Sequence, residues 1–279
     1  MTSALHRALI YLAALGLALA LILPVAWLVI LSISSSASVT SLPLHWIPAE
    51  LDLTRFARLV ARQETGAPAP YVSALGNSVI VALTATAIAL VVSILAAWAL
   101  SRGKRRDGLM MGMVATYMLP QAALALPLYG MLAAVGLLNN PLGLTLVYLG
   151  YIVPFTVWLL KSGFDQVPRE LDDAGRVDGL SSFGVMLRIG LPLSRATIAT
   201  TALFAILMSW DEFFYALLFT SNAAAKTVTV AIVDFTSGRI ADYGIVAAAG
   251  LIAAVPPVLI GFLLQRHLVE GLTAGGVKG

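Results

Sequence analysis

Apolar residues along this chain are gathered into six long runs, and most of the polar residues fall between them. A helix needs about 20 residues to cross a bilayer, and the runs cover residues 8–33, 74–100, 108–135, 142–160, 196–219 and 243–264. Hydrophobic residues make up 59% of the 279 residues and charged residues 11%, which excludes a soluble domain with a large core. The pattern predicts an all-α, polytopic membrane protein with six transmembrane helices, forming one domain over residues 1–279.

The first two runs are joined by a polar segment, residues 34–73, that contains four prolines. Within it, Leu51 to Val60 is predicted to form a short amphipathic helix whose basic side chains face water, namely Arg55, Arg58 and Arg62. At the start of the second run, Asn77 and Ser78 are expected to cap the helix, because their side-chain oxygens can accept bonds from its first N–H groups.

The distribution of basic residues predicts the orientation in the membrane. With the N-terminus inside, twelve of the 17 Lys and Arg residues lie on the inner side and five on the outer side, as the positive-inside rule expects. Arg102 to Arg106 form the strongest inside signal, so both termini and residues 161–195 are predicted to be cytoplasmic. Ser36-Ala37-Ser38 loosely fits a signal-peptide cleavage site, but the 26 residues of the first run favour an uncleaved anchor.

Residues 161–195 carry ten of the chain's charged residues, of which there are 17 basic and 14 acidic, although apolar runs flank them on both sides. The segment is therefore predicted to be a water-facing loop made of two short helices. Pro168 suits the start of the first helix and Gly179 its end, and Ser181 can cap a second helix that runs to about Ile189. An ordinary amphipathic helix at the membrane interface also fits the pattern.

The spacing of residues within this loop resembles the EAA loop of ABC importer permeases. Asp173-Ala174-Gly175 is followed by Gly179, Ile189 and Leu191-Pro192, with Asp173 in place of the usual Glu and Gly175 in place of the second Ala. In that family the loop is the coupling helix, which docks into a cleft of a cytoplasmic ATPase. The resemblance implies an ATPase-coupling role for Glu170, Asp173, Ala174, Gly175, Gly179, Ile189, Leu191 and Pro192.

Two adjacent carboxylates, Asp211 and Glu212, fall within an expected span. A charge at the bilayer centre costs about 2.5–3.5 kcal/mol on insertion scales, so such residues face water or the inside of a bundle. The pair is either an interfacial feature beside the belt residue Trp210 or part of a polar pathway. Tyr117 and Gln121 are further pathway candidates, although aromatic residues in spans more often serve packing.

The chain lacks residues that ATP hydrolysis or metal chemistry would need. Its single Gly-Lys pair, Gly103-Lys104, has Trp98 and Arg105 where a phosphate-binding loop has Gly and Ser or Thr. The three histidines are scattered and cysteine is absent, so no metal site is predicted. The basic residues flank membrane segments and indicate topology rather than nucleic-acid binding. The chain is therefore not expected to be an enzyme or to bind a cofactor.

Three further segments extend the resemblance over most of the chain: residues 119–144, 209–219 and 265–279. With the loop, they resemble the maltose-type, carbohydrate-uptake subfamily of ABC permeases, although the usual Trp-Asn-Glu is Trp210-Asp211-Glu212 here. The resemblance implies a second permease subunit, two ATPase subunits that bind ATP and Mg, and an extracytoplasmic substrate-binding protein. It also implies that a slim, flexible tail contacts the ATPases through Gln265, Gly271, Gly275 and Gly276.

The sequence thus predicts a permease subunit of an ABC importer that moves a sugar or related carbohydrate across a bacterial or archaeal plasma membrane, in contact with its lipid. One alternative is a proton-coupled secondary transporter that uses Asp211 and Glu212; another is a membrane scaffold that transports nothing. Uptake that persists without the ATPase would favour the secondary transporter, and a deletion without an uptake phenotype would favour the scaffold.

Overall fold

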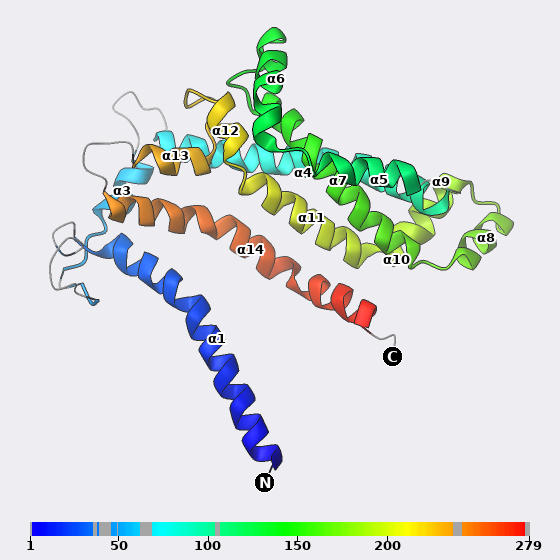
Figure 1. Ribbon diagram of the computed structural model, residues 1–279, viewed down its shortest axis with the longest axis horizontal. Coiled ribbons are helices and arrows are strands. Elements are labelled where there is room, and N and C mark those ends of the chain that lie inside the picture. Colours follow the sequence, from blue (N-terminus) through cyan, green and yellow to red (C-terminus); the bar gives the residue numbers. More distant parts are fainter. Residues whose placement is uncertain are drawn as a thin grey trace. The chain divides into compact units, whose positions relative to one another are not determined.

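A computed structural model gives the structure of residues 2–35, 38, 46–48, 50–61, 69–103, 107–236 and 242–276 (Figure 1). These residues form helices and no strand, and their β pairing is limited to an isolated bridge between Ser34 and Leu51. The all-α prediction is confirmed. Arg62, the basic residues 104–106 and the last three residues lie outside the described ranges.

The helices, in chain order, are α1 (Thr2–Ile33), α3 (Thr54–Val60), α4 (Pro70–Arg102), α5 (Asp107–Thr116), α6 (Gln121–Ala134), α7 (Pro141–Asp165), α8 (Arg169–Val177), α9 (Ser182–Val185), the π-helical turn η1 (Met186–Gly190), α10 (Leu191–Leu193), α11 (Arg195–Trp210), α12 (Phe214–Phe219), α13 (Val228–Asp234) and α14 (Tyr243–Gly276).

Four of these helices are long and apolar enough to cross a membrane: α1, α4, α7 and the first part of α14. Two bent pairs bring the number to six if each pair is one span: α5 with α6, bent by 86°, and residues 182–193 with α11, bent by 80°. The run predicted over residues 108–135 is interrupted at Pro120, whereas Pro127 lies inside α6. Pro120 has an extended backbone (ψ 127°) and cannot donate a helical hydrogen bond, so α6 begins only after it.

The expected run at 196–219 is also divided, since α11 ends at Trp210 and α12 begins at Phe214. The helix α7 extends to Asp165, so it ends about one turn later than the predicted span, and the first residues of the charged segment belong to this helix. The start of α7, by contrast, is determined by a neighbouring residue. The side chain of Asn140 caps α7 by accepting a bond of 2.9 Å from the N–H of Leu142.

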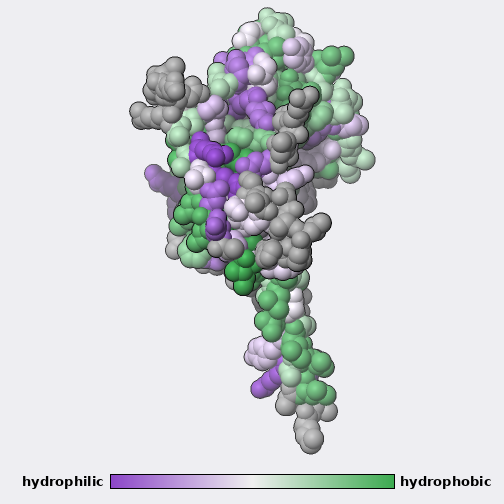
Figure 2. Space-filling view, turned by 90° about the vertical axis from the view of Figure 1, so that its left-hand side faces the viewer, coloured by the Kyte–Doolittle hydropathy of each residue, from purple (hydrophilic) through white to green (hydrophobic). Residues whose placement is uncertain are grey.

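Contacts divide the chain into two compact units, one of residues 1–72 and 231–255, the other of residues 73–230 and 256–279. In the first unit, α1 is apolar on nearly all sides, and none of its most apolar 18-residue window is buried within the chain. Its surface is largely hydrophobic, shown green in Figure 2. A helix that is hydrophobic all round belongs in lipid or against another helix.

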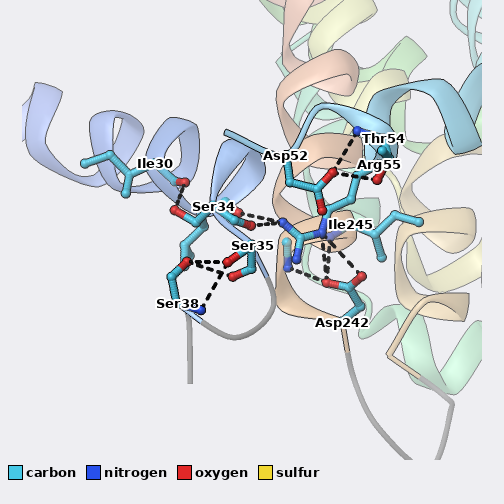
Figure 3. Close-up of polar contacts among 11 residues, drawn as sticks. Ile30, Ser34, Ser35, Ser38, Asp52, Thr54, Arg55, Asp242 and Ile245 are labelled. Atoms are coloured by element: carbon cyan, nitrogen blue, oxygen red, sulfur yellow. Dashed lines mark hydrogen bonds and ion pairs between the residues drawn. The ribbon is translucent and has the colours of Figure 1, made fainter. Parts of the chain in front are cut away.

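Arg55 on α3 does not face water as predicted: its side chain is 1% exposed. Its Nε lies 3.2 Å from Oδ1 of Asp242, and its guanidinium also donates to the carbonyl oxygens of Leu31 and Ser34 at the end of α1 (Figure 3). The Asp242 carboxylate in turn accepts from the N–H of Gly244, 3.0 Å away, at the start of α14. One buried guanidinium therefore joins α3 to the ends of α1 and α14.

Beside this ion pair, Asp52 precedes α3 and is bound to Thr54 (Figure 3). Its carboxylate accepts from the hydroxyl and the N–H of Thr54, and these bonds hold the pKa of Asp52 below its usual value. These bonds, between residues two positions apart, fix the conformation of the chain at the start of α3.

In the second unit, α7 is the central helix and packs against α5, α11 and α12. Small residues on α4 let it approach α7, where two pairs of hydroxyls bond across the interface: Thr84 with Thr145 at 3.1 Å and Ser93 with Thr156 at 2.6 Å. Bonds of this kind satisfy polar groups that lipid cannot. Ala85 and Ala89, which are fully buried, lie in one hydrophobic cluster with Tyr148 and Ile152 of α7.

Candidate functional site: the coupling segment and a polar cavity

The charged segment begins with α8, whose ends follow from the local sequence. Pro168 is its N-cap, and Gly179, with φ +86°, follows its C-terminus. The N–H of Gly179 bonds the carbonyl of Arg176 (3.0 Å), and the N–H of Leu180 bonds that of Gly175 (2.9 Å). This pair of bonds is a Schellman cap, which requires a left-handed residue that glycine adopts without strain.

The second helix of the segment starts as predicted, but it does not stop near Ile189. The hydroxyl of Ser181 accepts a bond of 3.1 Å from the N–H of Gly184 and so caps α9. The chain then continues through the π-helical turn η1 and α10 to Leu193. The prediction of two helices joined at Gly179 and Ser181 agrees with the structure, and the end near Ile189 is wrong.

The inner face of α8 is attached to the end of α4 by a buried ion pair that the motif analysis missed. Asp172 is 2% exposed, and its Oδ2 lies 2.6 Å from Nε of Arg102. The same guanidinium donates to the carbonyls of Phe164 (2.9 Å) and Val167 (3.2 Å), while Arg169 of α8 donates to the carbonyl of Ser101. The α8 helix is thus held to both α4 and the end of α7.

Arg102 also lies over the ring of Trp98, with Cζ 4.5 Å from its centroid. The other neighbours of this ring are Phe164, edge-on at 5.3 Å, and Gly190 of η1, where an added Cβ would lie 2.4 Å from the ring. A side chain at residue 190 would therefore collide with a ring that is held by two partners. Trp98 joins α4, α7 and η1 in one packed cluster with Val185 and Leu160.

The predicted coupling residues divide into three groups by position. Gly175 is buried against Ile189, and both line a groove of about 520 Å³ together with Ala174 and Pro192. Glu170 and Asp173 are exposed outside the groove, and the one ion pair of Asp173 within the described part of the chain is with the neighbouring Arg176, 2.9 Å away. Leu191 is partly buried beside the Trp98 cluster, and Gly179 forms the helix cap.

A second feature is a cavity of about 620 Å³ between α5, α6, α7, α11 and α12. The structure brings all four predicted pathway residues to its wall: Tyr117, Gln121, Asp211 and Glu212. Tyr151 from α7 and Phe213 to Tyr215 supply further aromatic walls. Its size and its mainly apolar, aromatic lining with a few polar groups are typical of a small-molecule site.

The two adjacent carboxylates have different environments. Glu212 is 7% exposed, and its oxygens accept from the N–H groups of Tyr215 (2.8 Å) and Ala216 (3.1 Å) at the start of α12. These bonds explain why α12 begins at this point, because a carboxylate satisfies N–H groups that have no partner inside the helix. Asp211 is exposed and, among the residues the structure describes, forms no side-chain hydrogen bond or ion pair.

Asn77 and Ser78 lie inside α4, which begins at Pro70, so the prediction that they cap its start is wrong. They bind the segment after α12 instead. Asn77 donates to the carbonyls of Ala223 and Lys226, and Ser78 accepts from the N–H of Val228 (2.8 Å). The next hydroxyl in this segment, Thr229, donates to the carbonyl of Glu212 (3.0 Å) at the wall of the cavity.

The tail does not form the flexible extension that its glycines predict, since α14 continues as a helix through Gly276. Gln265 is exposed on this helix. The side chains beyond it lie outside the described part of the chain. Gly271, Gly275 and Gly276 therefore have a helical backbone, and their contact with an ATPase stays a prediction.

Residues 89–273 match the family described as "Binding-protein-dependent transport system inner membrane component". The chain belongs to this family. It is 32% identical over 279 residues, 99% of this chain and 98% of the relative, to the trehalose/maltose transport system permease protein MalG of Thermococcus litoralis. It is also 32% identical to the sulfoquinovosyl glycerol transport system permease protein SmoH of Agrobacterium fabrum, over 92% of this chain and 88% of the relative.

The fold agrees with that of a solved bacterial ABC transporter that imports the acidic polysaccharide alginate. The TM-score is 0.77 over 95% of this chain and 98% of that one, at 19% identity. The resemblance to sugar permeases of ABC importers is thereby confirmed, and the chain is a multi-pass membrane protein of that family. Its relatives are transport permease subunits, and the described residues contain no cluster of His, Cys, Asp and Glu that could hold a metal ion.

Proposed function

We propose that this chain is one of two membrane-spanning subunits of an ATP-driven importer that moves a carbohydrate into the cytoplasm. The observation that carries the proposal is the 32% identity over nearly the whole chain to a trehalose/maltose permease. The other relative described above is also named for a sugar-containing substrate. The cavity supports the same function, because aromatic walls with a few polar groups suit a polyhydroxylated ring.

In this proposal, α5 with α6 crosses the membrane once and α11 with α12 crosses it once, which together with α1, α4, α7 and α14 gives six spans with both termini inside. The coupling segment then lies in the cytoplasm. An ATPase subunit binds the exposed face of α8, which carries Glu170 and Asp173, and the groove beside Ala174. The buried pair of Asp172 with Arg102 makes α8 move with the end of α4 rather than independently.

ATP can drive such a movement only if the two states of the ATPase bind α8 with different affinity. The remaining partners follow from the family. A second permease subunit completes the pathway, two ATPase subunits bind ATP and Mg, and an extracytoplasmic protein delivers the substrate. The helical tail, with Gln265, Gly271, Gly275 and Gly276, contacts the ATPases, and membrane lipid covers the apolar faces such as that of α1.

The test is uptake of trehalose and maltose by vesicles that contain the whole complex, with ATP hydrolysis measured in parallel. The Asp172→Asn variant removes the charge that faces Arg102, so we expect hydrolysis to continue while uptake per ATP falls at least severalfold. Asp165→Asn is the matched control, because among the described residues the exposed carboxylate of Asp165 pairs only with Lys161. Equal uptake per ATP in Asp172→Asn and wild type would refute the coupling role of this contact.

A secondary transporter is the second candidate, and the unpaired carboxylate of Asp211 in the cavity is the observation that favours testing it. A proton-coupled carrier would accumulate sugar without ATPase subunits and would stop when the proton gradient is collapsed. The ABC importer would need the ATPase subunits and ATP, and would continue without a proton gradient. These two vesicle measurements therefore separate the candidates.

A further inference from the structure

The charges at the wall of the cavity have one sign. Asp211 and Glu212 line it, and none of the residues that line it is Lys, Arg or His. The carboxylate of Glu212 is occupied by two backbone N–H groups, whose positive ends offset its charge. Asp211 has no such donor among the described residues and is exposed. Two carboxylates therefore line the cavity, and that of Asp211 has no hydrogen-bond or ion-pair partner in the described part of the chain.

The other polar groups at the wall are uncharged. The side-chain amide of Gln121 has no hydrogen-bond partner in the described part of the chain, and the hydroxyls of Tyr117 and Tyr151 are bound only to Met208, at 3.8 Å and 3.4 Å. These groups can bond to hydroxyls of a neutral sugar, and the aromatic rings can contact its apolar face. None of them can neutralise a carboxylate, sulfonate or phosphate on a substrate.

We propose that Asp211 makes this cavity select against anionic sugars, so that the substrate of the importer is an uncharged carbohydrate. The inference rests on the proposed function and adds the substrate class. The fold alone does not impose this choice, since a solved transporter of the same fold imports the acidic polysaccharide alginate. Selectivity within this cavity then depends on individual residues at its wall, and Asp211 is the charged one that has no partner in the described part of the chain.

The expected size of the effect follows from Coulomb's law. Two like charges roughly 8 Å apart, in a medium with an effective dielectric constant of about 20, repel enough to reduce occupancy on the order of 30-fold. If the cavity were as wet as bulk water, the same pair would give a factor of only about two. We therefore expect discrimination between these limits.

The experiment measures equilibrium binding of trehalose and maltose, each paired with its own 6-carboxylate derivative, to the purified whole complex without the substrate-binding protein. The wild type is expected to bind each neutral sugar several-fold to about 30-fold more tightly than its derivative. Asp211→Asn removes one of the two carboxylates at the wall and should lower this ratio, mainly by tighter binding of the derivatives. Asp211→Glu keeps the charge and should keep the ratio, and so should the control Asp165→Asn, whose carboxylate lies outside the cavity.

Two outcomes would overturn the inference. If Asp211→Asn leaves the ratio at its wild-type value while ATP-dependent uptake of the neutral sugar is intact, Asp211 is not a charge filter and the proposed function stands. If the wild-type complex shows neither binding nor ATP-dependent uptake of the neutral sugars, the carbohydrate function itself fails, and the filter fails with it. Uptake and binding together thus distinguish the two failures.

Discussion

Replacing Gly190 with alanine should destabilise the protein, although the change adds only one methyl group. The Cβ would lie 2.4 Å from Cζ3 and 2.9 Å from Cη2 of Trp98. Carbon atoms this close clash, so one of the two groups must move. The ring cannot easily move away, because Phe164 packs against it edge-on and Arg102 lies over its face. Either the cluster around Trp98 or the turn η1 must therefore shift.

Overpacking a core by a methyl group or two typically costs about 1–3 kcal/mol. For a chain of this length, each kcal/mol of destabilisation lowers the unfolding midpoint by roughly 2–4 °C. The assay is thermal unfolding of the detergent-solubilised complex, followed by tryptophan fluorescence. We expect Gly190→Ala to unfold several degrees below the wild type.

Gly175→Ala is the matched control, since it adds the same methyl group to a buried glycine of the same segment. Its Cβ would meet Cδ1 of Ile189 at 2.8 Å, but this atom is the far end of a flexible side chain that can turn away. We expect an unfolding midpoint within about one degree of the wild type, equivalent to a few tenths of a kcal/mol. Equal midpoints for Gly190→Ala, Gly175→Ala and wild type would refute the view that Trp98 is a fixed wall.

Three further outcomes are expected. Gly179→Val places a β-branched residue at φ +86°, at a cost of roughly 1–3 kcal/mol, and should lower uptake per ATP hydrolysed, whereas Gly179→Asn, which tolerates this region, should retain it; normal coupling in the valine variant would contradict the role of the cap. Asp242→Asn should lower the free energy of unfolding by about 1–3 kcal/mol, a range kept low because the carboxylate is one-third exposed, and the unfolding midpoint should fall with it. The double change with Arg55→Met should cost less than the sum of the two single changes; strict additivity would show that the pair is not coupled. Deleting residues 271–279 should lower substrate-stimulated ATP hydrolysis, and full stimulation in the truncated complex would show that the tail makes no productive contact.

Features that depend on neighbouring residues could be predicted from the sequence. The long apolar runs predicted the helices that are long and apolar enough to cross a membrane, and the predicted caps at Gly179 and Ser181 arise within one turn of the residues that make them. The cavity residues were also found, because a charge or amide in an apolar run is costly unless it meets water or another polar group. Such signals need no knowledge of which helices pack together.

Features that depend on distant residues could not be predicted in the same way. Arg55 resembles a solvent-facing residue of an amphipathic helix, but its partner Asp242 lies 187 positions away. Asp172 and Arg102, whose ion pair attaches α8, are separated by 70 positions. In the sequence, Arg102 indicated only which side of the membrane the loop faces. The break between α11 and α12 was missed although its cause is local, because Glu212 accepts from the N–H groups of Tyr215 and Ala216, only three and four residues later.

The single helix α4 touches both functional regions of the second unit. Near one end, Ser78 holds the N–H of Val228, next to the hydroxyl that binds Glu212 at the cavity wall. At the other end, Arg102 holds Asp172 of α8. Arg102 lies 24 positions after Ser78, and this stretch forms roughly 36 Å of unbroken helix, with no proline along that length. An α-helix hardly changes its length under load. A displacement of α8 that preserves the Arg102 contact must therefore shift or tilt the whole of α4, and this movement is transmitted to the segment that Ser78 binds beside the cavity.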